Sequence, residues 1–512
     1  MQEQAAKLAL RGNDDIIAKV SLNIFDFLRK DFMLKNAIGI SFAFIGVVVG
    51  AGFASGQEAL QYFASFGTEG IYGAILGSVL MIIAGVSILQ LGSYFQAEEH
   101  MEVLGNISGK IVSWVLDIAT ITTLFSIGFV MFAGAGSNLN QQFGIPIWIG
   151  AVLMLALVVG FGMLDVDKVT AAIGSLTPFL LAFVIFGCTY TLVTADLDWQ
   201  AINLATEQVD STLPNWWIAA LNYTGLNVMC VVSMALVIGG NYLDTRAAGL
   251  GGLMGGIGYL VMLMLLATAL MVKIEVVAGE DMPMLTLINE INPTLGLIMA
   301  VVVFGMIFAT ALGMFYALGK RLSRGREDKY RIIFTSTCLV GFVLSFVGFK
   351  NLVAYVYPIL GYLGILLIVV VSAAWLRGAQ KLRKEGKRRR RALELMHLKL
   401  DPRERFTKND EKELDYLISK SVIDEDEFVE ALEDEVNEEL MDDDEIEYDP
   451  EDPEGELVYV SYTEPQSKEE YEKNPDEPWN DTTVDDMIAA EEAEEAASGE
   501  EPEAEEGESP RL

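Results

Sequence analysis

Long apolar segments separated by short polar loops dominate the first three quarters of the chain. A helix needs roughly 20 apolar residues to cross the hydrocarbon core of a bilayer. Ten segments meet this requirement, with approximate limits 36–66, 70–95, 112–138, 145–163, 167–194, 215–240, 247–273, 294–319, 330–349 and 351–376. The pattern predicts an all-α polytopic membrane protein with ten transmembrane helices over residues 36–376.

The first apolar segment is interrupted near its middle by glycine and polar residues. It reads Gly46-Val-Val-Val-Gly-Ala-Gly-Phe-Ala-Ser-Gly-Gln-Glu58. Each glycine in a helix interior costs about 1 kcal/mol relative to alanine, and backbone groups left unpaired in lipid cost more. Such a break is tolerated only where protein covers it or where it lines a polar cavity. Because many secondary transporters build substrate sites from broken helices, the segment predicts a transporter.

The sixth segment also carries polar and small residues at mid-span, namely Asn222, Thr224, Gly225 and Asn227. Ten spans divide into two halves of five, and an odd number per half requires the second half to be inverted. The sixth span would then correspond to the first and should also be broken. The sequence therefore predicts a LeuT-like 5+5 inverted repeat with broken helices 1 and 6.

Basic residues are concentrated on one side of the predicted spans. That side carries the N-terminal segment, the loop cluster from Lys320 to Arg331, and the run Arg377–Arg391, whereas the other side carries only Lys273 and Lys350. The positive-inside rule then places both termini in the cytoplasm. We expect a multi-pass protein of the cell (plasma) membrane.

The segments outside the predicted spans fall into four parts. Residues 1–35 predict either an amphipathic helix on the membrane surface or an unstructured end. Residues 377–391 are polybasic, and Lys387–Arg391 would attract anionic lipid. Residues 392–447 are acidic but keep apolar residues at helical spacing, which suits short helices that bind each other or a partner protein. Residues 448–512 have a composition that predicts disorder.

The formal net charge of −36 arises from the C-terminal tail. Residues 392–512 contain 46 acidic and 9 basic residues, whereas residues 1–391 contain 25 and 26. The charge gives no reason to expect a nucleic-acid partner. For the tail, three roles stay open: a spacer, electrostatic self-docking onto the basic run, and recruitment of a protein partner.

Glu58 is the ionisable residue with the most unusual position. It follows the first break, at the start of the outer half-helix, where the helix N-terminus favours negative charge. An intramembrane carboxylate is a functional-site hypothesis by default. Glu58 could pair with a cation or a substrate amine, carry a coupling proton if desolvation favours its neutral form, or cap free amides of the half-helix.

The sequence contains no motif that indicates an enzyme or an ATP-binding module. Gly313–Lys320 resembles a phosphate loop but has one residue too many and lies in an apolar segment. Cys188, Cys230 and Cys338 lack metal-ligand spacing. We therefore expect no catalytic residues and no metal beyond a sodium ion, and any uphill transport must draw on an ion gradient.

These features resemble the LeuT-fold transporters of the amino acid–polyamine–organocation superfamily. The stretch from Gly50 to Glu58 further resembles the YkvI-type branch of uncharacterised bacterial membrane proteins, and the likeness covers roughly Asn36 to Leu376. It implies that backbone groups at the two breaks hold the carboxylate and the amine of the ligand. The substrate-binding residues that it implies are Gly50, Ala51, Gly52, Phe53, Ala54, Ser55, Gly56, Asn222, Tyr223, Thr224, Gly225 and Asn227.

The resemblance also implies where a coupling ion would bind. In sodium-coupled members, carbonyls of the first helix and hydroxyls of the eighth form the site, which corresponds here to Gly46, Val49 and the Thr310 hydroxyl. Ala309 stands where such members often have a second hydroxyl residue. Proton-coupled members can place a lysine near this site, and Lys168 is the only candidate. Sodium and proton coupling, the latter with Glu58 as a carrier, both stay open.

The sequence thus favours an ion-coupled secondary transporter of a small amino acid or amine-like solute that works by alternating access. The alternative is a membrane receptor or scaffold whose acidic cytoplasmic tail recruits partners. Sites built from backbone groups leave little side-chain signature, so the sequence does not name the solute.

Overall fold

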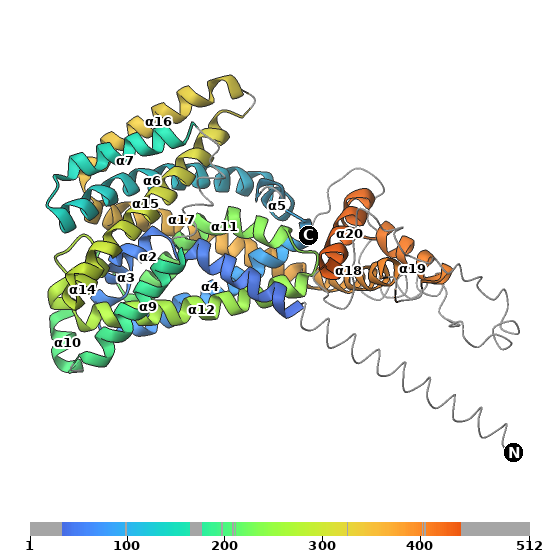
Figure 1. Ribbon diagram of the computed structural model, residues 1–512, viewed down its shortest axis with the longest axis horizontal. Helices are drawn as coiled ribbons and strands as arrows, with labels where there is room; N and C mark the ends of the chain where they lie inside the picture. Colours follow the sequence, from blue (N-terminus) through green and yellow to red (C-terminus); the bar gives the residue numbers. More distant parts are fainter. Residues whose placement is uncertain are drawn as a thin grey trace, which may run out of the picture.

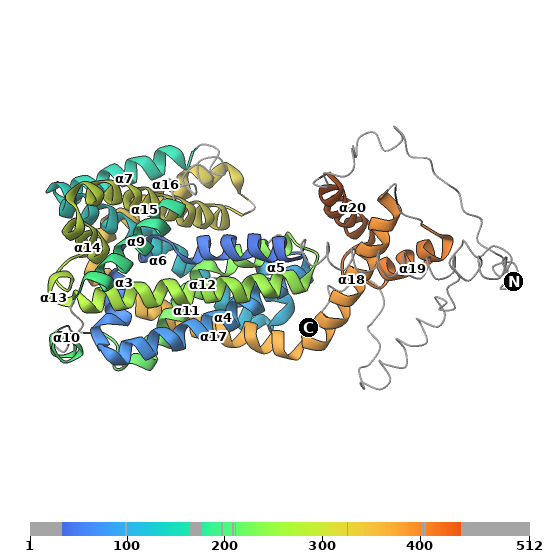
Figure 2. The same cartoon turned by 60° about the horizontal axis from the view of Figure 1, so that its bottom comes forward.

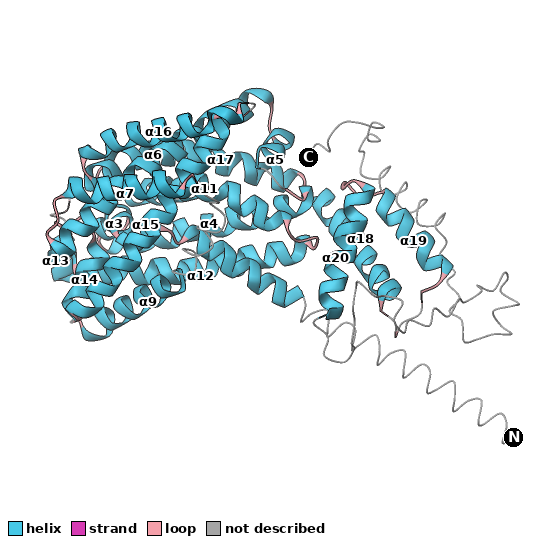
Figure 3. Cartoon of the chain, turned by 45° about the horizontal axis from the view of Figure 1, so that its top comes forward, coloured by secondary structure: helices cyan, strands magenta, loops and turns pink. Residues whose placement is uncertain are grey.

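The computed structural model describes residues 33–97, 100–163, 177–195, 198–206, 209, 211–324, 326–401, 403 and 406–441. The described part is helical and contains no strand (Figure 3). Most of the predicted amphipathic segment 1–35, the candidate Lys168, and the predicted disordered segment 448–512 lie outside the described residues.

The described part is that of a multi-pass membrane protein, since eight of its helices are long and apolar enough to cross a membrane. They are α4 (Thr68–Phe95), α6 (Lys110–Phe143), α9 (Thr177–Thr194), α11 (Trp216–Gly240), α12 (Thr245–Val272), α15 (Pro293–Leu322), α16 with its 3-10 extension η3 (Tyr330–Val347), and α17 (Phe349–Arg377). Two shorter apolar helices, Met33–Val48 and α7 (Ile147–Phe161), fall below this length. The count of ten spans and the inverted repeat therefore stay predictions.

The membrane helices pack into two groups (Figures 1 and 2). The first group is α4, α11 and α12, in which α11 and α12 each pack against α4 through small residues, and the second is α6, α7, α15 and α16. α17 packs against α11 of the first group and against α6 of the second. A cavity between the two groups can therefore change shape if they move relative to each other.

The predicted break in the first apolar segment is present. The first helix ends at Val48, and the chain continues as two short helices, α2 (Ala51–Ser55) and α3 (Gln57–Tyr62). Gly56 joins them with a φ of 75°, a left-handed conformation that glycine adopts without steric cost. A 3-10 turn, η1 (Ala64–Phe66), leads on to α4.

The predicted break in the sixth segment is wrong, because α11 is one continuous helix from Trp216 to Gly240. Its polar residues serve packing instead. The Asn222 side-chain amide donates to the Pro358 carbonyl of α17 at 2.8 Å, and the Thr224 hydroxyl donates to the Gly77 carbonyl of α4 at 3.1 Å. Small and polar residues in a span can join helices as readily as they interrupt one, and this ambiguity misled the sequence interpretation.

Short helices connect the long ones at both ends of the bundle. The connection from α12 to α15 contains α13 (Ile274–Val277) and α14 (Pro283–Ile291), and α10 (Trp199–Thr206) lies in the connection from α9 to α11. α5 (His100–Ile107) lies between α4 and α6, and η2 (Glu327–Lys329) precedes α16.

Three helices beyond α17 form a separate cluster, which we call the helical module (Figure 1). They are α18 (Ala379–Leu400), α19 (Lys408–Ser419) and α20 (Glu425–Met441). Their own hydrophobic core contains residues such as Met396, Leu417 and Leu432. The module lies at the end of the bundle where α17 finishes, which we call the module end. α18 runs without interruption through the predicted boundary between residues 391 and 392.

The basic run Lys387–Arg391, predicted to attract anionic lipid, is largely engaged within the protein. Arg389 has only 1% of its surface exposed, so it has no access to lipid. Arg391 pairs with Glu413 of α19 at 2.6 Å, which is a self-docking contact of the kind considered for the acidic tail. Lys387 remains exposed.

We predict that Gly225→Ala will destabilise the fold, because a Cβ at this position would overlap the Gly361 carbonyl of α17. Overpacking of this kind costs about 1–3 kcal/mol, which thermal unfolding in detergent would detect as a lower Tm. The matched control is Gly160→Ala, where an added Cβ meets only open space. Equal Tm values for both variants would contradict the packing role given to Gly225.

Candidate functional site

A cavity of about 960 Å³ lies between the two helix groups. Its walls come from the first helix and α2, from α6, from α11 and from α15. The charged residues of its lining at the module end of α6 and α15 are Asp117, Lys320, Arg321 and Arg324. Asp117 and Arg321 form an ion pair there. The cavity thus runs from mid-bundle to the module end, between one group and the other.

The opposite end of the bundle is closed by hydrogen bonds to the α12–α15 connection. The Gln141 side chain of α6 donates to the Met282 carbonyl at 3.0 Å and accepts from the Met282 amide at 2.9 Å. The Ser137 hydroxyl donates to the Asp281 carboxylate at 2.6 Å. From α17, the Lys350 ammonium donates to the Ala278 carbonyl at 2.8 Å. The described residues therefore show a cavity that opens towards the module end and is sealed on the other side.

Glu58 lines the inner part of the cavity and is 9% exposed. Its carboxyl group folds back over Gly52, so that a methyl group on Gly52 would overlap it. α3 thus places a carboxyl group directly beside the start of α2, where the first backbone amides of a helix have no internal partners. Only glycine at position 52 leaves room for this arrangement.

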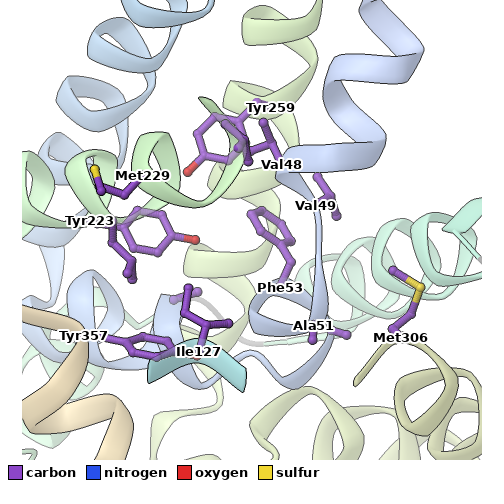
Figure 4. Packing of buried hydrophobic residues seen from close by; sticks show 14 of the residues in the cluster. Val48, Val49, Ala51, Phe53, Ile127, Tyr223, Met229, Tyr259, Met306 and Tyr357 are labelled. Carbon is purple, nitrogen blue, oxygen red and sulfur yellow. The ribbon is translucent and has the colours of Figure 1, made fainter. Parts of the chain in front are cut away.

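Four tyrosines lie within electrostatic range of the Glu58 carboxyl, namely Tyr62, Tyr223, Tyr259 and Tyr357. The Tyr223 hydroxyl donates a hydrogen bond to Glu58, and a second hydrogen bond joins the hydroxyls of Tyr223 and Tyr259. Figure 4 shows Tyr223, Tyr259, Tyr357 and Phe53 gathered around one space. Of these aromatic residues, Phe53 and Tyr357 line the cavity beside Glu58, whereas Tyr223 and Tyr259 are buried behind the lining. A carboxyl group beside aromatic side chains can interact with an organic cation.

The predicted residues of the first break divide into two sets. Gly50, Ala51, Gly52 and Phe53 line the cavity, whereas Ala54, Ser55 and Gly56 do not contribute to its lining among the described residues. The Ser55 hydroxyl instead donates to the Gly52 carbonyl at 2.9 Å and accepts from the Gln57 amide at 3.2 Å. The second bond gives the Gln57 amide a partner at the start of α3, and the Gly52 carbonyl also accepts from the Gly56 amide at 3.2 Å.

The predicted residues of α11 divide in the same way. Asn227 lines the cavity, and its side chain donates to the Tyr223 carbonyl at 2.9 Å. Tyr223 reaches Glu58, as described above. Asn222, Thr224 and Gly225 face neighbouring helices instead. The Asn222 carboxamide oxygen, for example, accepts a hydrogen bond from the Tyr62 hydroxyl at 3.2 Å.

Gly46 and Thr310, two of the candidate ion ligands, line the cavity, whereas Val49 is buried without contributing to the described lining. The Gly50 amide donates to the Val48 carbonyl at 3.0 Å, which leaves the Gly46 carbonyl without its usual helical partner. The Thr310 hydroxyl donates to the Met306 carbonyl of its own helix at 3.0 Å, so its oxygen keeps lone pairs for a cation. These two groups suit a sodium ion.

The sequence interpretation missed Tyr259 and Tyr357, and it did not connect Asp117 with Arg321. Aromatic residues in apolar segments carry no sign of which ones converge. The partner of Asp117 lies on a helix about 200 positions later in the chain. Only the packing of α6 against α15 brings the two together.

Comparison with curated proteins finds two relatives, both uncharacterised proteins of Bacillus subtilis. The chain is 22% identical over 336 residues to the uncharacterised membrane protein YkvI of Bacillus subtilis, covering 65% of this chain and 94% of that protein. It is 26% identical over 326 residues to the uncharacterised protein YyaD of the same organism, covering 64% and 93%. The resemblance to the YkvI-type branch is thereby confirmed. No family model matches the chain.

Solved structures with a similar arrangement are transporters. Mhp1 in its inward-facing conformation gives a TM-score of 0.45 at 13% identity, covering 66% of this chain and 75% of Mhp1. MhsT in complex with L-phenylalanine gives 0.45 at 12%, covering 79% and 98%. The manganese transporter of Eremococcus coleocola gives 0.36 at 14%, covering 80% and 86%.

The three cysteines offer a test of the cavity. Cys230 contributes to its lining, whereas Cys188 and Cys338 are fully buried. We predict that a small cationic thiol reagent added at the module end will modify Cys230 much faster than the other two, as peptide mass spectrometry would show. Cys230→Ala should remove the fast phase. Equal rates at all three cysteines, or reaction only from the opposite side, would contradict the cavity described here.

Proposed function

We propose that the protein is an ion-coupled secondary transporter that carries a small amino acid or amine-like solute by alternating access. The observation that carries this proposal is the one-sided cavity between two helix groups, with a broken helix and a carboxyl group at its inner end. A transporter of this type must close one side while the other is open, and the seal at the α12–α15 connection meets that requirement.

The position of Glu58 favours the amine-like end of this solute range. In the arrangement implied by the LeuT-fold resemblance, free amides at the first break hold a carboxylate of the ligand. Here the Glu58 carboxyl already lies beside Gly52 in that break. A second carboxylate would meet repulsion from an ionised Glu58, whereas an ammonium group would be attracted both by Glu58 and by the aromatic faces around it.

The coupling ion in this proposal is a sodium ion or a proton. The Gly46 carbonyl and the Thr310 hydroxyl both reach the cavity and are oxygen ligands of the kind that sodium prefers. Glu58 is the candidate proton carrier, because its carboxyl is buried and has the Tyr223 hydroxyl as a hydrogen-bond partner. Replacement of external sodium by potassium, at constant pH, distinguishes the two.

The module end faces the cytoplasm in this proposal. The basic residues at that end include the cluster from Lys320 to Arg331, and the positive-inside rule places such clusters on the cytoplasmic side. The structure then corresponds to a cytoplasm-open state of a plasma-membrane protein, with anionic lipid in reach of the exposed Lys387.

The helical module favours a second candidate function, that of a scaffold or receptor whose tail recruits partners. YkvI is too short to contain a counterpart of the whole chain, since 336 residues make up 94% of it. A truncation after Arg391 would cut α18 in two, so a deletion that begins after Met441 is the cleaner test of the acidic tail. Full transport without those residues would make the tail regulatory or dispensable, whereas loss of a bound partner in a protein with no measurable transport would favour the scaffold.

We predict that Glu58→Gln and Gly52→Leu will each reduce solute uptake into proteoliposomes by at least about tenfold. Loss of an interaction with a buried charge costs a few kcal/mol, and about 1.4 kcal/mol corresponds to each factor of ten. Candidate solutes would first be found by thermal shift, because a ligand that binds the native state raises the Tm.

Glu275→Gln is the matched control, because Glu275 is exposed on α13, away from the cavity. It should transport like the native protein. Undiminished uptake in both cavity variants would refute the proposed site, and absence of gradient-driven uptake for every solute that binds would favour the scaffold.

A further inference from the structure

Arg389 is a buried arginine in the helical module whose side chain reaches into the membrane body. Its guanidinium donates to the carbonyls of Ser93 and Tyr94, both at 2.6 Å. These carbonyls lie in the last turn of α4, where carbonyl groups lack the usual helical partners. The Ser93 carbonyl also accepts from the Gln96 backbone amide at 3.3 Å and from the Gln96 side chain at 2.8 Å. A positive charge at a helix C-terminus is also favourable. Arg389 therefore caps α4 from another part of the chain.

Glu385 holds Arg389 in place. It is 1% exposed and accepts from the Arg389 guanidinium at 2.8 Å and from the Ser421 hydroxyl at 2.7 Å. Burial acts to raise the pKa of Glu385, but Arg389, Ser421 and Arg388 outweigh it and hold the pKa below its usual range. Glu385 is thus ionised at neutral pH, and the pair links α4 through α18 to the turn between α19 and α20.

Leu243 is the reciprocal contact, a residue of the membrane body inside the core of the module. It lies in the loop between α11 and α12, is 4% exposed, and belongs to the same hydrophobic cluster as Met396 and Leu432. Its backbone amide donates to the Glu435 carboxyl of α20. Gly386 of α18 contacts Thr245 at the start of α12 so closely that no Cβ would fit.

We propose that the helical module is a docking domain that binds the first helix group through Arg389 and Leu243 and thereby stabilises the conformation whose cavity is open at the module end. The proposal rests on the proposed function, because it assigns a regulator to the same cavity.

The link between α17 and the module explains how docking can act on the cavity. α18 follows α17 after the single residue Gly378, and α17 packs against both groups. At the module end, the Trp375 indole of α17 donates to the Gln90 side chain of α4 at 2.6 Å. α17 therefore connects the docked module to both groups, because it packs against α4 and α11 of the first group and against α6 of the second. No residue of α18–α20 lines the cavity in the described part, so the module acts on helix positions and does not plug the opening.

Docking and opening are then coupled equilibria. A contact that is made in only one conformation stabilises that conformation by its differential free energy. Couplings between sites are typically worth a 5- to 150-fold change in an equilibrium constant. Loss of docking should shift the protein away from the open state by a factor in this range.

We test this with the native thiol of Cys230 as a probe of opening, in the full-length chain with Cys188→Ala and Cys338→Ala. The variants are Arg389→Leu, which removes the cap on α4, and Leu243→Asp, which places a charge in the module core from the other side. Modification of Cys230 from the module end should slow by at least about fivefold in each. Arg383→Leu is the matched control, because Arg383 is exposed on the same helix, and it should label at the native rate.

Hydrogen exchange of α19 and α20 accompanies the labelling and shows whether the module remains folded. The module is undocked whether it is released as a folded unit or unfolds. A native labelling rate of Cys230 in Arg389→Leu or in Leu243→Asp would therefore overturn the proposal. Labelling needs no solute, whereas uptake does. A failed docking proposal is therefore distinguishable from a failed transport proposal.

The partly buried Glu435 makes docking proton-linked. Burial under the α11–α12 loop, together with neighbouring carboxylates, raises the pKa of Glu435 from 4.5 to about 8, and the bond from the Leu243 amide opposes this only in part. The titratable groups that face it are Asp244, Tyr242, Glu438 and Glu439. Because the docked state binds the proton more tightly, docking is strongest below about pH 4.5 and weakens as the pH rises towards 8.

We predict that hydrogen-exchange protection of residues 241–245, corrected for the intrinsic exchange rate, will fall by roughly twentyfold between pH 6.5 and pH 8.5. Linkage to a single proton gives a tenfold change per pH unit below the docked pKa of about 8 and a smaller change above it. Glu435→Gln, which stays neutral, should keep its protection across this range. The same fall in native protein and in Glu435→Gln would exclude Glu435 as the linked group.

Discussion

The structure depends on one constraint, that every backbone polar group within an apolar bundle needs a partner. The first helix stops at Val48, and the chain between Val48 and Ala51 is tolerated because it lies against the cavity and because Ser55 bonds the freed groups of the next turn. The left-handed turn at Gly56, between α2 and α3, lets the chain fold back so that Glu58 lies over Gly52. The unusual backbone and the buried carboxyl are therefore one feature.

The broken first helix and Glu58 lie between the two helix groups, and the module lies at one end of the cavity that they line (Figure 1). The broken helix and α11 face the second group across the cavity, and the α12–α15 connection seals the far side. The module binds the first group at the opposite end, where Arg389 caps α4 and Leu243 packs into the module core. In the mechanism that we propose, solute binding, closure and docking act on the same set of helices, so a contact distant from Glu58 influences access to it.

Much of the fold could be predicted from the sequence, because apolar length and glycine content report directly on spans and on the first break. The site could be predicted only in part. Glu58 stands out as a charge in a span, but its tyrosine neighbours come from several helices that only packing brings together. The predicted break in α11 is wrong for the same reason. Asn222 and Gly225 are residue types that often interrupt a helix, but here they pack against α17. Arg389 looked like part of a lipid-binding run because sequence cannot show that α4 ends beside it.

The central claim is that the two helix groups move relative to each other. Spin labels at Arg246→Cys and Arg326→Cys, in a chain whose native cysteines are alanine, would measure this motion directly, because both positions are exposed at the module end and lie on different groups. Double electron–electron resonance should show two distance populations whose shares change with sodium or pH, the shorter one belonging to a state closed at this end. A single distance that is the same under all conditions would contradict the account.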